Sequence, residues 1–135
     1  LTADMITGFP GETEADQAAA VEFLEQVGFA AVHVFPYSRR PGTKADAMPE
    51  QLSHAVKSAR AHEAQRVADA CKQRYLAQQV GRILPVLFET EHDGNWVGHS
   101  DNYCLVRVAG EDLRGLVKNV KISAVSGQML VGDLV

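Results

Sequence analysis

The stretch that decides the fold lies near the start of the chain, where residues 2–13 read TADMITGFPGET. The first six of these residues form a strand candidate, and the following GFPG forms a tight turn. Thr13 precedes Asp16 by three residues, which is the spacing of a helix capping box. We therefore predict a strand, a turn and an amphipathic helix that ends at Gly28.

The residues after this helix complete a βαβ unit. Residues 29–37 (FAAVHVFPY) are nearly continuously apolar, as expected of a strand that is buried on both faces. The two strands should run parallel, with a right-handed crossover. A polar loop over residues 38–48 and a long helix from about Pro49 to Gly81 are predicted next. The apolar stripe of this helix contains Leu52, Val56, Ala59, Val67, Ala70 and Cys71.

Beyond Gly81 the hydrophobic pattern changes to period two. Five strand candidates cover residues 83–89, 95–100, 103–108, 116–125 and 129–135. Asp93-Gly94 and Ser126-Gly127 stand where hairpin turns are needed. The predicted fold is therefore α/β: a partial parallel βα-barrel segment with a long helix over residues 1–80, followed over residues 81–135 by a small five-stranded, OB-like antiparallel β-barrel.

Composition excludes several classes of protein. The 135 residues are 46% hydrophobic, which argues against intrinsic disorder, and no apolar run is long enough to span a bilayer. The net charge of −4 is shared between the two segments, so neither has the basic balance typical of a nucleic-acid-binding domain. Two distant cysteines suit a reducing compartment, but are too few to hold an iron–sulfur cluster. Because the chain begins at Leu1 rather than at a methionine, and residues 1–6 already read as structure, we expect a piece of a longer protein. The lack of a leader then says little about the parent.

The residues alone leave their roles open. The GFPG turn can present backbone N–H groups to a ligand, but such a turn is usually only a turn. Glu12 is most simply explained by the positive end of the following helix. In the barrel segment, Trp96 and Tyr103 either stack on bases or fill the interior. The cations there need not form one patch, because Lys118 and Lys121 are three residues apart on one strand.

The TADMITGFPGET stretch, followed by VHVFPYS at residues 32–38 and PGT at residues 41–43, strongly resembles the radical S-adenosylmethionine methylthiotransferases. Arg40 occupies the usual arginine place of the second motif, whereas Arg39 stands where the family commonly has proline. The terminal barrel resembles the TRAM domain, the RNA-binding appendage of this family. The resemblance covers essentially the whole chain.

The resemblance implies roles for individual residues. Ile6, Gly8, Phe35, Pro36 and Tyr37 correspond to positions near the adenine of S-adenosylmethionine. The barrel would bind the anticodon stem-loop of tRNA through Tyr103, Arg107, Arg114, Lys118 and Lys121. The cysteine motifs that hold the 4Fe-4S clusters are absent from this chain, which should therefore bind no metal and be inactive by itself.

Within the family, HVFPYS and GHSDNY (residues 98–103) look most like the branch that adds a methylthio group to C2 of N6-threonylcarbamoyladenosine beside the anticodon. The alternatives are the branches acting on a ribosomal-protein aspartate or on isopentenyladenosine, and a non-catalytic RNA-binding module. The resemblance implies a cytoplasmic enzyme without membrane attachment. From the unpaired strand edges that one βαβ unit leaves, we also expect a homodimer.

Overall fold

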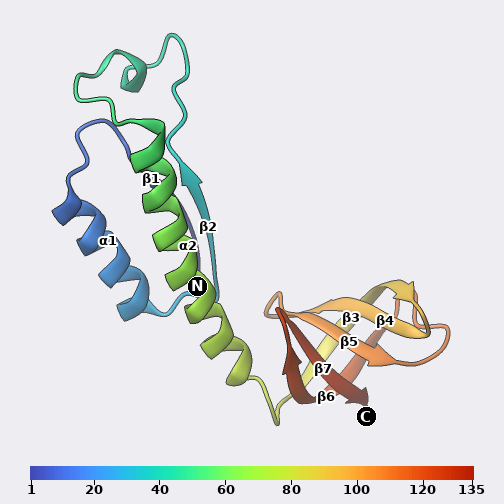
Figure 1. Ribbon diagram of the computed structural model, residues 1–135. Coiled ribbons are helices and arrows are strands. Elements are labelled where there is room, and N and C mark those ends of the chain that lie inside the picture. Colours follow the sequence, from blue (N-terminus) through green and yellow to red (C-terminus); the bar gives the residue numbers. More distant parts are fainter. The chain divides into compact units, whose positions relative to one another are not determined.

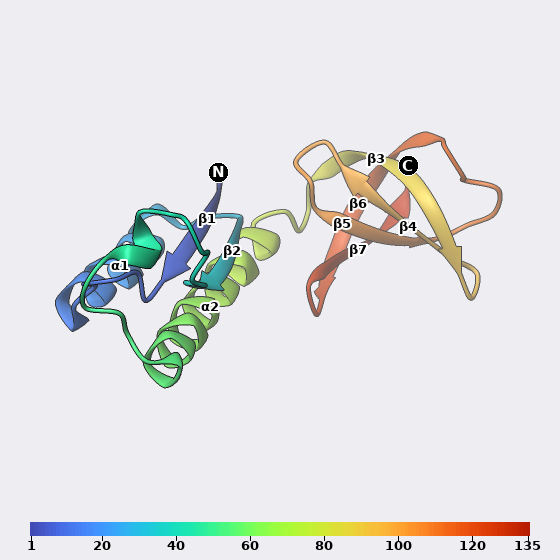
Figure 2. The same cartoon turned by 90° about the horizontal axis from the view of Figure 1, so that it is seen from above.

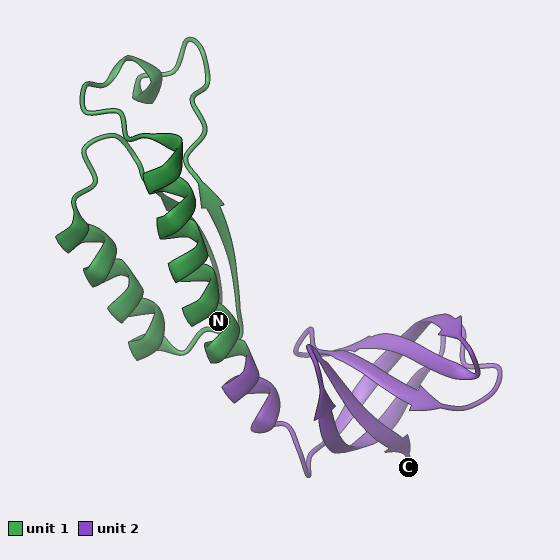
Figure 3. Ribbon diagram, in the orientation of Figure 1, with its two compact units in different colours: residues 1–72 green, residues 73–135 purple.

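The computed structural model describes all 135 residues and has an α/β architecture with a two-stranded parallel sheet, a five-stranded mixed sheet and two α-helices (Figure 1). The chain divides into two compact units, Leu1–Lys72 and Gln73–Val135 (Figure 3). This division lies earlier than the expected boundary at residues 80 and 81. The last turn of the long helix joins the second unit because Tyr75 and Leu76 pack against that unit's core.

The first unit begins with the predicted βαβ arrangement. Strand β1 spans Thr2–Thr7, helix α1 spans Glu14–Val27 and strand β2 spans Ala31–Pro36. The two strands pair in parallel, as predicted, and the register places Ile6 opposite Phe35.

The ends of α1 follow the local signals in the sequence. Thr13 Oγ1 accepts a hydrogen bond from Asp16 N, and the Asp16 carboxylate accepts one from Thr13 N, which confirms the capping box. The hydrogen bonds that the Thr13 backbone and hydroxyl donate hold the pKa of Asp16 below its ordinary value. Gly28 ends the helix in the left-handed conformation, with φ of 65°.

Only one face of the β1–β2 sheet is covered. Helix α1 and the long helix both lie on this face (Figure 2), where the buried core contains Leu24, Phe29, Val32, Ala64 and Ala68. The opposite face exposes Asp4, Ile6, His33 and Phe35. The prediction that residues 29–37 are buried on both faces is therefore wrong, because both helices of the unit pack on the same side.

The long helix, α2, spans His54–Ala77 and starts later than the predicted position near Pro49. Glu50 has φ of 60°, which a right-handed helix does not allow. Instead, the Ser53 carbonyl oxygen and hydroxyl accept hydrogen bonds from Lys57 N and Val56 N, at 3.1 and 3.3 Å, respectively. A short 3-10 helix, η1 (Ala45–Ala47), lies in the preceding loop.

The buried face of α2 differs in part from the predicted stripe. Cys71 is buried as predicted, but the other most buried residues are Ala64, Ala68 and Leu76, and the predicted Val56 is 38% exposed. Small alanine side chains allow this helix to lie close to its neighbours. A search for large apolar residues therefore overlooks the side of the helix that faces the core.

The second unit contains the five predicted strands. They are β3 (Ile83–His92), β4 (Asn95–Ser100), β5 (Leu105–Ala109), β6 (Val117–Ser126) and β7 (Met129–Leu134). The strand order β3-β4-β5-β7-β6 closes on itself as a barrel. Gly94 and Gly127 occupy the two predicted hairpin turns with positive φ.

The prediction that this sheet is antiparallel throughout is wrong, because β5 and β7 pair in parallel. Strand β6 is antiparallel to both β3 and β7, so β7 runs in the direction of β3. Strand β5 runs in that direction too, since β4 is antiparallel to both β3 and β5. The closing pair must then be parallel.

The barrel core resolves the two roles that the sequence left open for the aromatic residues. Trp96 is only 7% exposed and packs inside with Phe88, Val106 and Leu130. Tyr103 is 86% exposed. Of the two, only Tyr103 is available to a ligand at the surface. Neither helix has the length and apolar character needed to cross a membrane.

Candidate functional site

The first candidate surface, here called the strand-end platform, consists of Ile6 and Phe35. The two side chains are partners in the parallel register and are 57% and 52% exposed. Pro36, the last residue of β2, is also exposed. These residues form an apolar surface suited to a flat, apolar group.

Gly8 and Tyr37, which were also predicted to lie beside this surface, pack against other residues of the unit. A Cβ atom on Gly8 would overlap Lys57 Cγ and lie 3.1 Å from Lys57 Cα, so glycine is required there for packing against α2. The Tyr37 ring packs edge-on against Phe9, with centroids 5.3 Å apart, and Lys57 Nζ lies 5.6 Å from its centre. The buried Tyr37 hydroxyl has no hydrogen-bond partner.

Glu12 has a role that sequence reasoning missed. Its Oε1 accepts hydrogen bonds from Gly8 N at 2.9 Å and from Arg60 Nη1 at 2.7 Å. Arg60 Nη1 also donates to the Glu12 carbonyl oxygen at 2.8 Å. This largely buried ion pair fastens the β1–α1 turn to α2. No local signal could reveal it, because the partners are 48 residues apart.

The strand-end platform and the two cysteines differ in how well they suit the expected S-adenosylmethionine and iron–sulfur clusters. The strand-end platform fits an adenine ring, since it offers exposed apolar area beside the carboxyl ends of two parallel strands. The residues do not fit an iron–sulfur cluster: Cys71 and Cys104 are both buried and lie in different units. No group of three or more histidine, cysteine or acidic side chains suited to a metal ion occurs in the structure.

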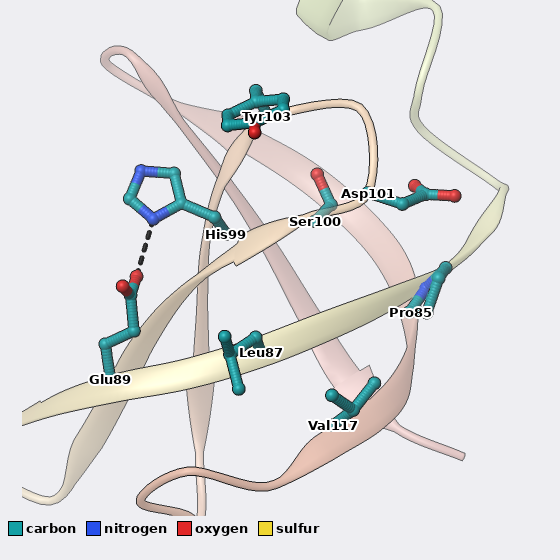
Figure 4. Close-up of a pocket in the computed structure, with 8 residues that line it drawn as sticks. All are labelled: Pro85, Leu87, Glu89, His99, Ser100, Asp101, Tyr103 and Val117. Carbon is teal, nitrogen blue, oxygen red and sulfur yellow. Dashed lines mark hydrogen bonds and ion pairs between the residues drawn. The ribbon is translucent and has the colours of Figure 1, made fainter.

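The second candidate surface, here called the barrel hollow, lies on the outside of the barrel (Figure 4). It has a volume of about 450 Å³. Its lining consists of Pro85, Leu87, Glu89, His99, Ser100, Asp101, Tyr103 and Val117. Sequence reasoning identified only Tyr103 among these. The missed signal is the first half of β3, whose outward positions hold the apolar residues Ile83, Pro85 and Leu87.

The predicted cations do not surround Tyr103. Arg107 lies on β5, Arg114 in the loop before β6, and Lys118 and Lys121 on β6. None of the four lines the barrel hollow. Lys121 Nζ instead donates to the Gly81 carbonyl oxygen at 2.6 Å. The hollow that Tyr103 lines therefore contains none of the four positive charges that were expected to act with it.

Comparison with known proteins gives the chain a set of homologues. It is 38% identical to a threonylcarbamoyladenosine tRNA methylthiotransferase of Bacillus subtilis over 90% of its own length. It is 40% and 37% identical to tRNA-2-methylthio-N(6)-dimethylallyladenosine synthases of Maricaulis maris and Campylobacter jejuni, over 99% and 100% of its length. No family profile matches the chain.

The chain spans 28–32% of the length of these relatives. The identities extend over nearly all of the chain, so both compact units take part in the similarity. The chain is therefore homologous to one segment of the tRNA methylthiotransferases.

Proposed function

From this homology we propose that the chain is a C-terminal part of a radical S-adenosylmethionine methylthiotransferase that modifies tRNA. Residues 1–80 would complete the radical S-adenosylmethionine domain, and residues 81–135 would form an OB-like TRAM barrel. The observation that carries the proposal is 38% identity to a threonylcarbamoyladenosine tRNA methylthiotransferase over 90% of the chain. The closed order β3-β4-β5-β7-β6 supports the barrel assignment.

The proposed reaction adds a methylthio group to C2 of N6-threonylcarbamoyladenosine next to the anticodon. A second candidate substrate is the dimethylallyl-type adenosine, because relatives named for that product are 36–40% identical to the chain. Mass spectrometry of tRNA nucleosides from a strain lacking the parent gene separates the two. Loss of the methylthio form of threonylcarbamoyladenosine supports the first substrate, and an unchanged profile of both nucleosides contradicts both.

In this proposal Ile6 and Phe35 hold the adenine of S-adenosylmethionine, with Gly8, Pro36 and Tyr37 shaping the adjoining strand ends. The bound cofactor supplies radical chemistry for the modification. The 4Fe-4S clusters would be held by other parts of the parent, and this chain alone would be inactive. Its own contribution is an apolar surface on two strand ends, the first of which leads into the turn that the Glu12–Arg60 ion pair fastens to α2.

We expect weak and strongly salt-dependent binding of an anticodon stem-loop to the barrel. Replacing Arg107, Arg114, Lys118 or Lys121 singly by Ala should weaken binding to all tRNAs, because phosphate contacts carry no sequence information. Each replacement should reduce the slope of log K against log salt by about one. Fluorescence anisotropy at several salt concentrations measures both quantities. Unchanged slopes in all four variants would move tRNA recognition to another part of the parent.

A homodimer of the chain is proposed from the β1–β2 sheet. Each of these strands has only one partner, so each presents an unpaired edge. Pairing of these edges between two copies would bury them, and packing of α2 against a second copy is another route to a dimer. Multi-angle light scattering of the chain at high concentration should give twice the monomer mass, and a monomer mass would contradict the proposal.

A further inference from the structure

The barrel hollow has no assigned ligand, and its lining is unsuited to phosphate. We propose that it binds one unpaired nucleobase that carries an amino group, with the base stacked on Tyr103 and its amino edge directed to Asp101 or Glu89. This inference rests on the proposed function, since it assumes that the chain binds RNA. The cations of the barrel are proposed to bind the RNA phosphates without regard to sequence. This inference adds a separate site with a preference among bases.

The walls of the hollow suit the flat face of a base. Leu87 and Val117 are 43% and 62% exposed, and Pro85 is partly exposed beside them. Their side chains lie on β3 and at the start of β6, while Tyr103 comes from the turn between β4 and β5 (Figure 4). Stacking of bases on aromatic and apolar side chains is the common way in which proteins bind unpaired nucleotides.

The backbone at Tyr103 is strained in a way that exposes the ring. Its φ of 60° is a left-handed conformation, which is uncommon for an aromatic residue. The turn is nevertheless well bonded, because Tyr103 N donates to the Ser100 carbonyl oxygen at 2.9 Å. Cys104 N donates to Ser100 Oγ at 3.0 Å. The strain thus presents a ring that is 86% exposed from a fixed turn.

Buried polar groups hold this turn from behind. Ser100 Oγ donates to Asn102 Oδ1 at 2.6 Å, and Asn102 Nδ2 donates to Gln79 Oε1 at 3.1 Å. Gln79 is only 1% exposed and donates through Nε2 to the Tyr75 carbonyl oxygen. Since the turn is ordered before a ligand arrives, stacking on Tyr103 does not have to pay for ordering it.

The charged groups of the hollow determine which part of a nucleotide can enter. Its ionisable side chains are Glu89, Asp101, His99 and Tyr103, and His99 Nδ1 lies 2.6 Å from Glu89 Oε2. The lining contains no lysine or arginine, so a phosphate would meet two carboxylates without a permanent cation. Carboxylates accept hydrogen bonds from the amino groups of adenine, cytosine and guanine. Uracil has no amino group, and its N3–H donor lies between two carbonyl oxygens that a carboxylate repels.

The test uses the whole 135-residue chain and four fluorescent RNA pentamers, UUXUU, in which X is A, C, G or U. In anisotropy titrations, the pentamers with an amino-bearing base should bind roughly tenfold more tightly than the all-uracil pentamer. Asp101→Asn combined with Glu89→Gln should reduce this preference several-fold, because the amides keep a carbonyl acceptor but lose the negative charge. Tyr103→Ala should weaken binding of all four pentamers by roughly tenfold. Tyr103→Phe keeps the ring and should bind them as tightly as the unmodified chain.

Glu111→Gln combined with Asp112→Asn provides the matched control, because it also removes two negative charges, and both residues lie outside the hollow. Equal preference for the four pentamers in the unmodified chain would overturn the proposal. So would identical effects of the two double variants, because Asp101 and Glu89 would then only repel phosphate. If a stem-loop binds but no pentamer does, the base site is refuted while the proposed function stands. If neither binds, the base site is refuted together with RNA binding by this chain, while the nucleoside profile of the parent strain remains the test of the proposed function.

Discussion

Gly98→Ala should destabilise the barrel by about 3 kcal/mol or more, at or above the upper end of the usual cost of overpacking. Gly98 lies on β4 opposite Phe88 of β3. A Cβ atom there would overlap the Leu87 carbonyl oxygen and lie 2.8 Å from Phe88 Cα. These obstacles are backbone atoms of the paired strand, so no side-chain rotation relieves them, and β3 and β4 must separate.

Urea unfolding followed by tryptophan fluorescence measures this effect, because the single tryptophan, Trp96, lies in the barrel core. Gly127→Ala is the matched control: φ is 59° there, but nothing lies within 4 Å of the added Cβ. It should cost only about 1 kcal/mol of backbone strain. Equal free energies of unfolding for the two variants would show that β3 and β4 can move apart without loss of pairing.

Arg60→Met should destabilise the first unit by about 3 kcal/mol, the lower end of the range for breaking a buried ion pair. The side chains of Arg60 and Glu12 are only 11% and 14% exposed. The methionine retains most of the apolar stem but leaves the Glu12 carboxylate with the hydrogen bond from Gly8 N. An incompletely compensated, largely buried charge would then oppose folding of the β1–α1 turn.

Circular dichroism at the helix band follows this unit, since α1 and most of α2 belong to it. The double variant Arg60→Met, Glu12→Gln removes the charge as well and should recover part of the loss. Arg39→Met is the control, because Arg39 pairs with Asp46 at 2.7 Å but is 56% exposed; a cost below about 1 kcal/mol is expected. If Arg60→Met costs no more than Arg39→Met, the Glu12–Arg60 pair does not fasten the turn.

Sequence reasoning succeeded where a structure depends on neighbouring residues. The capping box, the glycine that ends α1 and the glycines of the two hairpin turns act over a few positions, so their effects can be read directly from the chain. It failed at the start of α2. Pro49 favours a first helical position, but Glu50 has a positive φ, so the helix begins only at His54. The hollow beside Tyr103, which none of the four expected barrel cations lines, was not foreseen.

The sequence by itself determined which segments are strands or helices, the parallel pairing of β1 and β2, and the resemblance to a known family. Tertiary structure alone decided that Trp96 is buried while Tyr103 is exposed, that β5 meets β7 in parallel, and that Glu12 binds Arg60. Hydrophobic period and turn chemistry act within one or two turns of chain. By contrast, burial, strand partners and charge pairing depend on segments that come together only when the whole unit has folded.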